Sequence, residues 1–149
     1  MAGRVLGVDF GLARLGLAVA DALGIAAHML PQLAVKGKTL AEAAALVAAL
    51  AAREEAERIV LGLPLNMDGT EGPAARRVRE FGRLLAEQSR LPVEFEDERL
   101  STVAAEERLR ERELTRKKRK QRLDSLSAQV ILQGWMEARQ KLPPPSGEG

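Results

Sequence analysis

Two short aliphatic runs at the start of the chain constrain its fold most strongly. The runs cover residues 4–10 and 15–21, and a loop that begins with Gly11 separates them. Apolar runs around a glycine-bearing loop are typical of a β-hairpin. A third apolar stretch, about residues 26–35, contains Pro31, which cannot donate a hydrogen bond to a neighbouring strand. We therefore expect an antiparallel meander whose third strand is short or lies at an edge.

Helices and strands alternate through the next part of the chain. The alanine-rich segment from Thr39 to about Glu55 has apolar residues at helical spacing and is predicted to be a helix. Residues 58–62 are a compact β-branched run, typical of a strand buried in a parallel sheet. Pro73 then stands where the first residue of a helix is expected. Residues 92–96 are predicted to form the next strand.

Two more helices are expected after that strand. One runs from Ser101 or Thr102 to about Glu113, and the other is opened by Asp124, since all three residue types favour a helix N-cap. A meander followed by strand–helix alternation predicts an α/β domain with a mixed sheet flanked by helices. We expect this single domain to cover residues 1–140, with residues 141–149 as a disordered tail.

The composition restricts the chemistry that is available. The 149 residues include no cysteine and one histidine, His28, which excludes disulfide scaffolds, thiolate zinc sites and multi-histidine metal sites. No apolar run approaches the roughly 18 residues that span a bilayer, and the chain begins with a strand pattern where a secretory signal would stand. We therefore expect no membrane partner and a cytoplasmic location, with chemistry based on carboxylates, hydroxyls, amides and cations.

The net charge of +2 conceals a local asymmetry. Residues 116–122 (RKKRKQR) carry six positive charges and no negative one, so the rest of the chain carries −4. This pattern indicates a localised contact with a polyanion, although a solvated basic loop would also explain it. The candidate nucleic-acid contacts here are Arg116, Lys117, Lys118, Arg119, Lys120 and Arg122.

Three acidic residues stand at the ends of predicted elements: Asp9, Glu98 and Asp124. If they converge, they could hold Mg²⁺ or Mn²⁺, because hard cations prefer oxygen ligands. Two such ions about 3.5–4 Å apart activate a water and stabilise the leaving oxygen in phosphodiester cleavage. Each residue also has a purely structural explanation: Asp9 in a turn, Glu98 in a solvated loop and Asp124 as a helix N-cap.

The loop after the predicted buried strand is a second candidate site. Asn66, Asp68 and Thr70 lie where open α/β sheets bind ligands, and they could contact a phosphate or sugar. A polar turn before a helix is the alternative. We expect His28 to be a partly buried polar residue and Trp135 to be a core residue. With 3% aromatic residues, phosphate contacts are favoured over base stacking as the main recognition mode.

Taken together, these motifs resemble the YqgF family of bacterial Holliday-junction-resolvase-like proteins, also described as pre-16S rRNA nucleases. The resemblance extends from about Arg4 to Glu137. It rests on residues 7–11 (GVDFG) with Gly16, residues 62–70 (GLPLNMDGT), residues 97–102 (DERLST) and Asp124-Ser125.

The resemblance implies a ribonuclease H-like fold and a metal-dependent nuclease with Asp9, Glu98 and Asp124 as its acidic triad. It further implies that the basic segment is a flexible loop before the last helix, beside the site. By the same resemblance, the motifs near the site contain Asn66, Asp68, Arg99, Ser101 and Thr102. Leu12 departs from the family, which often has a small hydroxyl residue at that position. We expect Arg14 to contribute a phosphate contact in its place.

The leading hypothesis is an endonuclease with a two-metal site that acts on structured RNA. Within it, maturation of the 5′ end of the 16S ribosomal RNA precursor is favoured, with a ribosomal precursor particle as a possible partner. Resolution of branched DNA junctions is the alternative substrate, and a non-catalytic nucleic-acid-binding or assembly factor is an alternative class. An ATP-dependent phosphotransferase is disfavoured because the chain is short for two lobes, and no motif predicts an oligomeric state.

Overall fold

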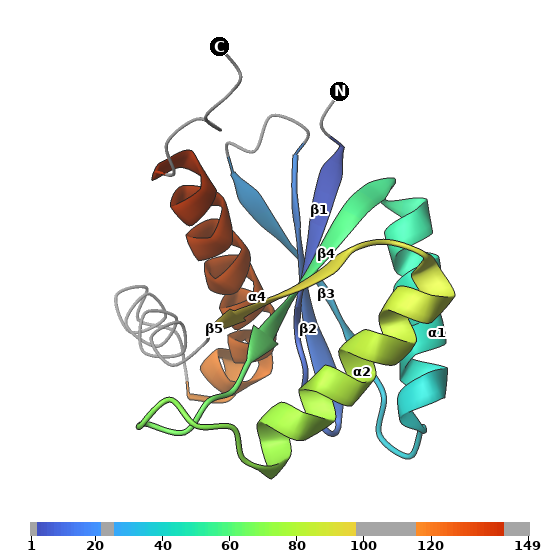
Figure 1. Cartoon of the computed structure of the whole chain (residues 1–149). Helices are drawn as coiled ribbons and strands as arrows, with labels where there is room; N and C mark the ends of the chain where they lie inside the picture. Colours follow the sequence, from blue (N-terminus) through green and yellow to red (C-terminus); the bar gives the residue numbers. More distant parts are fainter. Residues whose placement is uncertain (1–2, 22–25, 98–115, 142–149) are drawn as a thin grey trace.

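The structure is a computed structural model that describes residues 3–21, 26–97 and 116–141 (Figure 1). Its elements follow the predicted order, and the helix expected over about residues 101–113 lies outside the described residues. So do residues 142–149, where the tail is expected. The elements are β1 (Arg4–Asp9), β2 (Arg14–Ala20), β3 (Ala27–Ala34), α1 (Leu40–Arg53), β4 (Ala56–Leu63), α2 (Pro73–Ser89), β5 (Val93–Asp97) and α4 (Arg116–Lys141).

The five strands form one mixed sheet in the order β3-β2-β1-β4-β5. The first three strands are an antiparallel meander, as predicted, while β4 pairs in parallel with both β1 and β5. Because parallel strands end at the same edge of a sheet, the carboxyl ends of β1, β4 and β5 lie together. The sheet therefore has one edge at which three strands end.

The strand β3 lies at the edge of the sheet, as its proline predicts. Its register with β2 shifts by one residue, so that Pro31 and Gln32 together face Gly16. This is a β-bulge, a position where the missing N–H of proline breaks no ladder bond.

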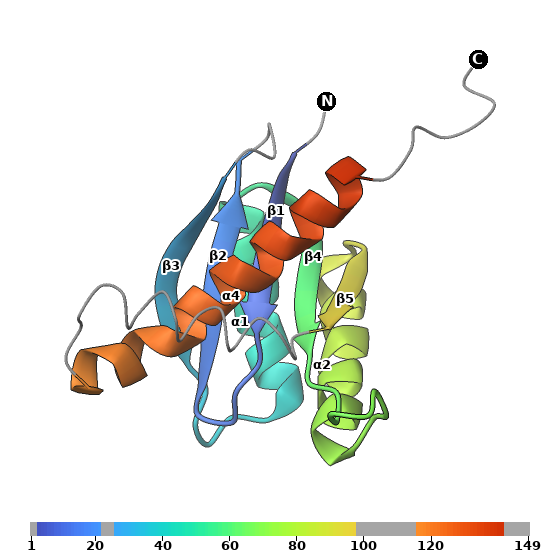
Figure 2. The same cartoon turned by 90° about the vertical axis from the view of Figure 1, so that its left-hand side faces the viewer.

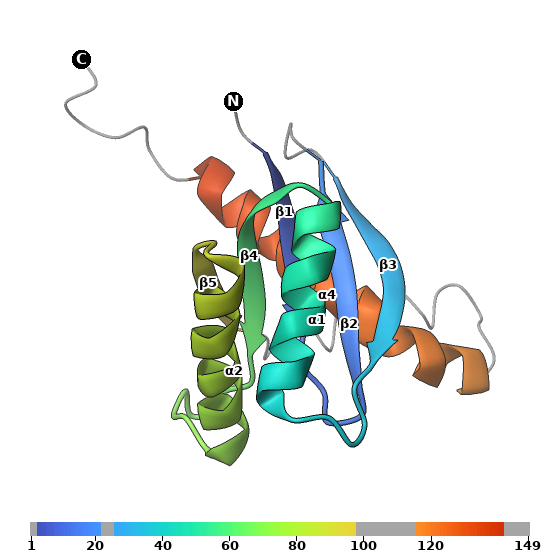
Figure 3. The ribbon, with the colours of Figure 1, turned by 90° about the vertical axis from the view of Figure 1, so that its right-hand side faces the viewer.

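Helices cover both faces of the sheet. Helices α1 and α2 pack on one face and α4 crosses the other (Figures 2 and 3). The face toward α1 and α2 carries large residues such as Leu6, Val8 and Leu61. The face toward α4 carries small ones, among them Ala18 and Ala20. The sheet thus separates two apolar cores of different character.

Local sequence explains where α1 and α2 begin. The Thr39 hydroxyl accepts a hydrogen bond from the Glu42 N–H at 3.1 Å, and the Glu42 carboxylate accepts one from the Thr39 N–H at 2.9 Å. This reciprocal capping box fixes the start of α1. Helix α2 begins at Pro73, as predicted, because proline at the first helical position loses no hydrogen bond.

Helix α4 begins earlier than the sequence predicts. Its first residue is Arg116, so the basic segment is helical rather than a loop, and Asp124 lies inside the helix rather than at its N-cap. The physical reason is helix propensity: Arg, Lys and Gln are good helix formers, and neither glycine nor proline occurs between Arg116 and Gly134. Among the described helices, none is long and apolar enough to cross a membrane.

Candidate active site

The candidate site lies at the edge where the three parallel strands end. Strand β1 ends at Asp9, β4 at Leu63 and β5 at Asp97. The register pairs Val8 with Leu61 and Leu63 with Asp97, so the three strands end at nearly the same level. Glu98 follows β5 directly and lies outside the described residues.

The side chain of Asp9 lies on the face of the sheet that α4 covers. Successive side chains in a strand point to opposite faces. Val8 is buried in the core beneath α1 and α2, and a Cβ on Gly7 would lie 2.9 Å from the Cβ of Leu132 in α4. Asp9 is two residues after Gly7, so its side chain points to the same face, and it is half-buried. Its carboxylate therefore belongs to the α4 face.

Glycines occupy the sheet positions on both sides of Asp9. Gly16 of β2 is its partner in the antiparallel ladder. The parallel register, continued one residue past Val8 and Leu61, brings Gly62 of β4 level with it on the other side. Because neither glycine has a side chain, neighbouring strands leave the carboxylate uncrowded.

Helix α4 carries Asp124 toward the same region. Asp124 lies one helical turn before Ala128, whose carbonyl oxygen would lie 3.2 Å from a Cβ on Gly7. Figure 2 shows α4 crossing the sheet obliquely, with its earlier turns toward the end where β1 finishes. The backbone thus brings the turn with Asp124 and the strand with Asp9 together, while the Asp124 side chain lies outside the described part. Among the described side chains, no three acidic or histidine groups could hold a metal ion.

A fourth carboxylate, which sequence reasoning missed, lies on the same face. Glu96 pairs with Gly62 of β4. Its side chain points to the same face as that of Glu94, two residues earlier. The Glu94 carboxylate accepts a hydrogen bond from the Trp135 indole of α4 at 3.2 Å. Burial raises the pKa of Glu96, and the neighbouring Asp97 and Glu94 raise it further. The sequence signal was available, because acidic residues alternate at positions 94, 96 and 98.

The loop after β4 is held by its own polar side chains. The Asp68 carboxylate accepts hydrogen bonds from the Thr70 N–H at 3.0 Å and from the Thr70 hydroxyl at 2.6 Å. The Asn66 amide donates to the same hydroxyl at 2.9 Å. These residues, predicted as ligand contacts, therefore brace the turn, and Met67 at its tip is 89% exposed.

An ion pair fixes this loop to α2. Arg79 donates two hydrogen bonds to the Glu71 carboxylate, at 2.7 and 2.6 Å, and its guanidinium lies 4.9 Å from the ring centroid of Phe95. The hydrogen bonds from Arg79 hold the pKa of Glu71 below its usual value. The loop is thus tied to the helix that follows it and to the last strand.

The other predicted nucleic-acid contacts fall into three groups. Arg14 begins β2, is exposed, and has the parity of Gly16, which places it on the α4 face near Asp9. The first turns of α4, which contain the basic segment, extend past β3 at the end of the sheet where β1 finishes (Figures 2 and 3). Arg99 and Ser101 lie outside the described residues.

Two predictions about individual side chains have different outcomes. Trp135 is a core residue, as expected, with 8% of its surface exposed. His28 is exposed rather than partly buried, because it lies on the edge strand β3, which pairs with β2 on one side only in the described sheet.

The chain is similar in sequence to a protein family and to named bacterial proteins. The family model RuvX, described as Holliday junction resolvase, matches residues 3–138. A Myxococcus xanthus protein named "Putative pre-16S rRNA nuclease" is 44% identical over 91% of this chain and 88% of its own length. An Anaeromyxobacter dehalogenans protein of the same name is 48% identical, over 91% of this chain and 98% of its own length.

Solved structures share the fold at low sequence identity. T. thermophilus RuvC in complex with a Holliday junction substrate matches with a TM-score of 0.59 and 19% identity, over 93% of this chain and 96% of that one. The fowlpox virus Holliday junction resolvase matches with a TM-score of 0.57 and 12% identity, over 91% and 99%. The fold is ribonuclease H-like, as the motifs predict. The chain therefore belongs to the RuvX (YqgF) family of nucleases that its motifs resemble.

Proposed function

We propose that the chain is a divalent-metal-dependent endonuclease that cleaves structured RNA to mature the 5′ end of the 16S ribosomal RNA precursor. The observation that carries the proposal is the position of Asp9, at the edge shared by three parallel strands and on the face that α4 crosses. The names of the relatives support the RNA substrate.

The residues at this edge suit a hard cation. The chain has no cysteine, and its one histidine is on the far edge strand, so the donors available near Asp9 are oxygens. Mg²⁺ and Mn²⁺ prefer such ligands. Asp9, with Glu98 and Asp124, would hold the metal. When bound, the metal would supply Lewis-acid activation of the attacking water and stabilisation of the leaving oxygen.

The chain's own residues provide the rest of the chemistry. The basic segment of α4 and Arg14 would bind phosphates on either side of the cleaved bond, because guanidinium and ammonium groups contact the backbone without regard to base identity. The braced loop around Asn66 would limit how the substrate enters, since its ion pair to α2 fixes its position.

The test is cleavage by Asp9→Asn beside a matched control. Asp21→Asn is suitable because Asp21 follows the end of β2, at the opposite edge of the sheet. On a precursor rRNA fragment with Mg²⁺ or Mn²⁺, Asp9→Asn should lower the cleavage rate about 100-fold or more, since an amide is a weaker metal ligand. Asp21→Asn should cleave like the unaltered protein. Normal cleavage by Asp9→Asn, with an unchanged circular dichroism spectrum, would remove Asp9 from the site.

A four-way DNA junction belongs in the same assay, because the family is described as Holliday junction resolvase. Cleavage of the junction but not of the RNA would replace the RNA substrate with branched DNA. Binding to either substrate without cleavage, at any concentration of Mg²⁺ or Mn²⁺, would instead identify a non-catalytic nucleic-acid-binding factor.

A further inference from the structure

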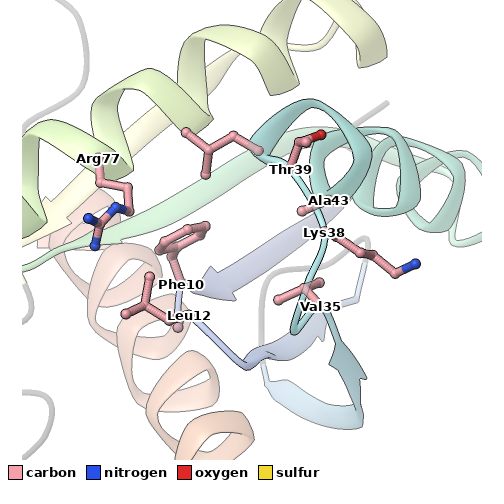
Figure 4. Close-up of a pocket in the computed structure, with 9 residues that line it drawn as sticks. Phe10, Leu12, Val35, Lys38, Thr39, Ala43 and Arg77 are labelled. Atoms are coloured by element: carbon pink, nitrogen blue, oxygen red, sulfur yellow. The ribbon is translucent and has the colours of Figure 1, made fainter.

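A pocket opens at the same edge of the sheet, on the face opposite to the Asp9 carboxylate. It has a volume of about 240 Å³ and lies between the turn after β1 and the first turns of α1 and α2 (Figure 4). Its apolar lining comes mainly from Phe10, Leu12, Val35 and Leu40, and two cationic residues, Lys38 and Arg77, also line it. None of these residues is used by the proposed metal site.

The apolar lining includes Leu12, which is not part of the buried core. Leu12 is 71% exposed and lies beside the ring of Phe10 in Figure 4. The ring of Phe10 packs against the ring of Phe81, with 4.9 Å between the ring centroids. The turn itself is tight, because a Cβ on Gly11 would lie 2.5 Å from the carbonyl oxygen of Arg14. The structure therefore holds an exposed apolar surface in a defined position.

Cations stand on opposite sides of this surface. Arg77 comes from α2 and Lys38 from the segment before α1, and Figure 4 shows them flanking the apolar residues. Within the part of the chain that the structure describes, the Arg77 side chain forms no ion pair, whereas Arg79 and Arg83 on the same helix are both paired with glutamates. An apolar centre between positive charges is complementary to a nucleotide base between two phosphates.

We propose that this pocket takes the base of one unpaired nucleotide of the substrate, next to the cleaved bond, while Arg77 and Lys38 contact the flanking phosphates. The proposal rests on the proposed nuclease function. Asp9 and Phe10 are consecutive, about 3.8 Å apart at Cα, with side chains on opposite faces, so one strand crossing the edge can meet both. The volume is below the roughly 300–1,000 Å³ of pockets for drug-sized ligands, which suits a single base.

This subsite would also act in substrate choice. Extracting a base from a duplex costs stacking and pairing energy, and the cost is least for a base that is already unpaired. The pocket would therefore favour cleavage beside an unpaired nucleotide over cleavage within a continuous helix.

The experiment combines a protein variant with the removal of single bases. A hairpin RNA from the precursor, with its natural single-stranded extension, is prepared intact and with one abasic ribose at each position around the cut. Affinity is measured in chelator and cleavage in Mg²⁺, for the unaltered protein and for Leu12→Ala. We expect one abasic position to weaken binding by the unaltered protein about five- to tenfold, a loss in the lower part of the range for base stacking. We expect Leu12→Ala to bind that RNA and the intact RNA equally.

Three further variants separate the subsite from general effects. Arg77→Gln should weaken binding and lower the salt slope by about one unit. Arg53→Gln, at the far end of α1, should change neither the affinity nor the salt slope. Leu46→Ala, a truncation of an exposed leucine on the same helix, should leave the dependence of affinity on the abasic position unchanged. Because Leu12 is exposed, Leu12→Ala should melt like the unaltered protein.

An abasic profile that is the same for Leu12→Ala and the unaltered protein would overturn the subsite while leaving the nuclease intact. A duplex substrate cleaved as fast as one with an unpaired nucleotide would have the same effect. If the unaltered protein neither binds nor cleaves the intact RNA, the proposed function fails, and the subsite fails with it.

Discussion

The close contact between Gly7 and α4 leads to a prediction that links stability to activity. A Cβ at position 7 would lie 2.9 Å from the Cβ of Leu132, 3.3 Å from its Cδ2 and 3.2 Å from the Ala128 carbonyl oxygen. Non-bonded carbon atoms normally stay about 3.5–4.0 Å apart. In Gly7→Ala, the helix and the strand must therefore separate by more than about half an ångström. The Leu132 Cβ is attached directly to the helix backbone, so rotation of the side chain cannot relieve the contact.

The expected cost follows from two opposing effects. Overpacking of this kind costs about 1–3 kcal/mol, whereas replacing a strand glycine by alanine recovers about 0.5–1 kcal/mol of backbone entropy. The net loss is then about 0–2.5 kcal/mol, with a midpoint of about 1 kcal/mol. For a chain of this size, the midpoint corresponds to a fall in Tm of about 2–4 °C. Urea unfolding monitored by circular dichroism measures the loss directly.

The same displacement moves the turn of α4 that carries Asp124 relative to Asp9. A misplacement of about 1 Å in a catalytic arrangement can reduce the rate about 100-fold. We therefore expect Gly7→Ala to lose about 10- to 100-fold in cleavage rate at 25 °C, where it is still folded.

Gly134→Ala is the matched control. Gly134 lies on α4 two residues beyond Leu132, and a Cβ there has no described atom within 4 Å. This substitution should stabilise the helix by up to about 1 kcal/mol and leave cleavage unchanged. If Gly7→Ala proved as stable and as active as the unaltered protein, the contact between β1 and α4 would not be as tight as described.

Two further predictions concern charge. Glu71→Gln should lower the urea midpoint at pH 7, since the carboxylate held by Arg79 has a lowered pKa and stabilises the fold only while ionised. The difference from the unaltered protein should shrink as the pH falls below about 4.3, the ordinary glutamate value, and a difference that stays constant to pH 3 would contradict the ion pair. Replacing Lys117, Lys118, Arg119 and Lys120 by glutamine should weaken RNA binding and reduce its salt slope by up to about three units, measured by titration between 50 and 200 mM salt. An unchanged slope would place the phosphate contacts elsewhere.

Local patterns in the sequence were enough to predict the elements, but not how they meet. The meander, the edge position of β3 and the start of α2 at Pro73 each follow from residues close together in the chain. The parallel register does not, because it pairs Val8 with Leu61, which are separated by α1 and the whole of two strands. The proximity of Asp9 to the carboxyl ends of β4 and β5 therefore could be seen only in the structure.

The predicted start of α4, at Asp124, was wrong for a different reason. Asp124 is a good N-cap residue, and this favoured a helix that opens there. The competing signal was the absence of any helix-breaking residue in the basic segment, together with the helix propensity of lysine and arginine. A run of charges is also typical of a solvated loop, and this favoured a loop over a helix for the basic segment. As a result, the cations are fixed on the same helix as Asp124 rather than on a separate loop.

The different character of the two faces of the sheet explains why the site can form on one of them. On the α1 and α2 face, Leu6 and Leu61 keep the helices at a distance set by large side chains. On the other face, Gly7 and Ala18 let the backbone of α4 approach β1 so closely that a single added methyl group would collide with it. A carboxylate side chain is short, so residues on a strand and on a helix can share one cation only where their backbones are this close. The small residues that weaken the apolar core on this face are therefore what would allow Asp9 and the turn carrying Asp124 to share the proposed cation.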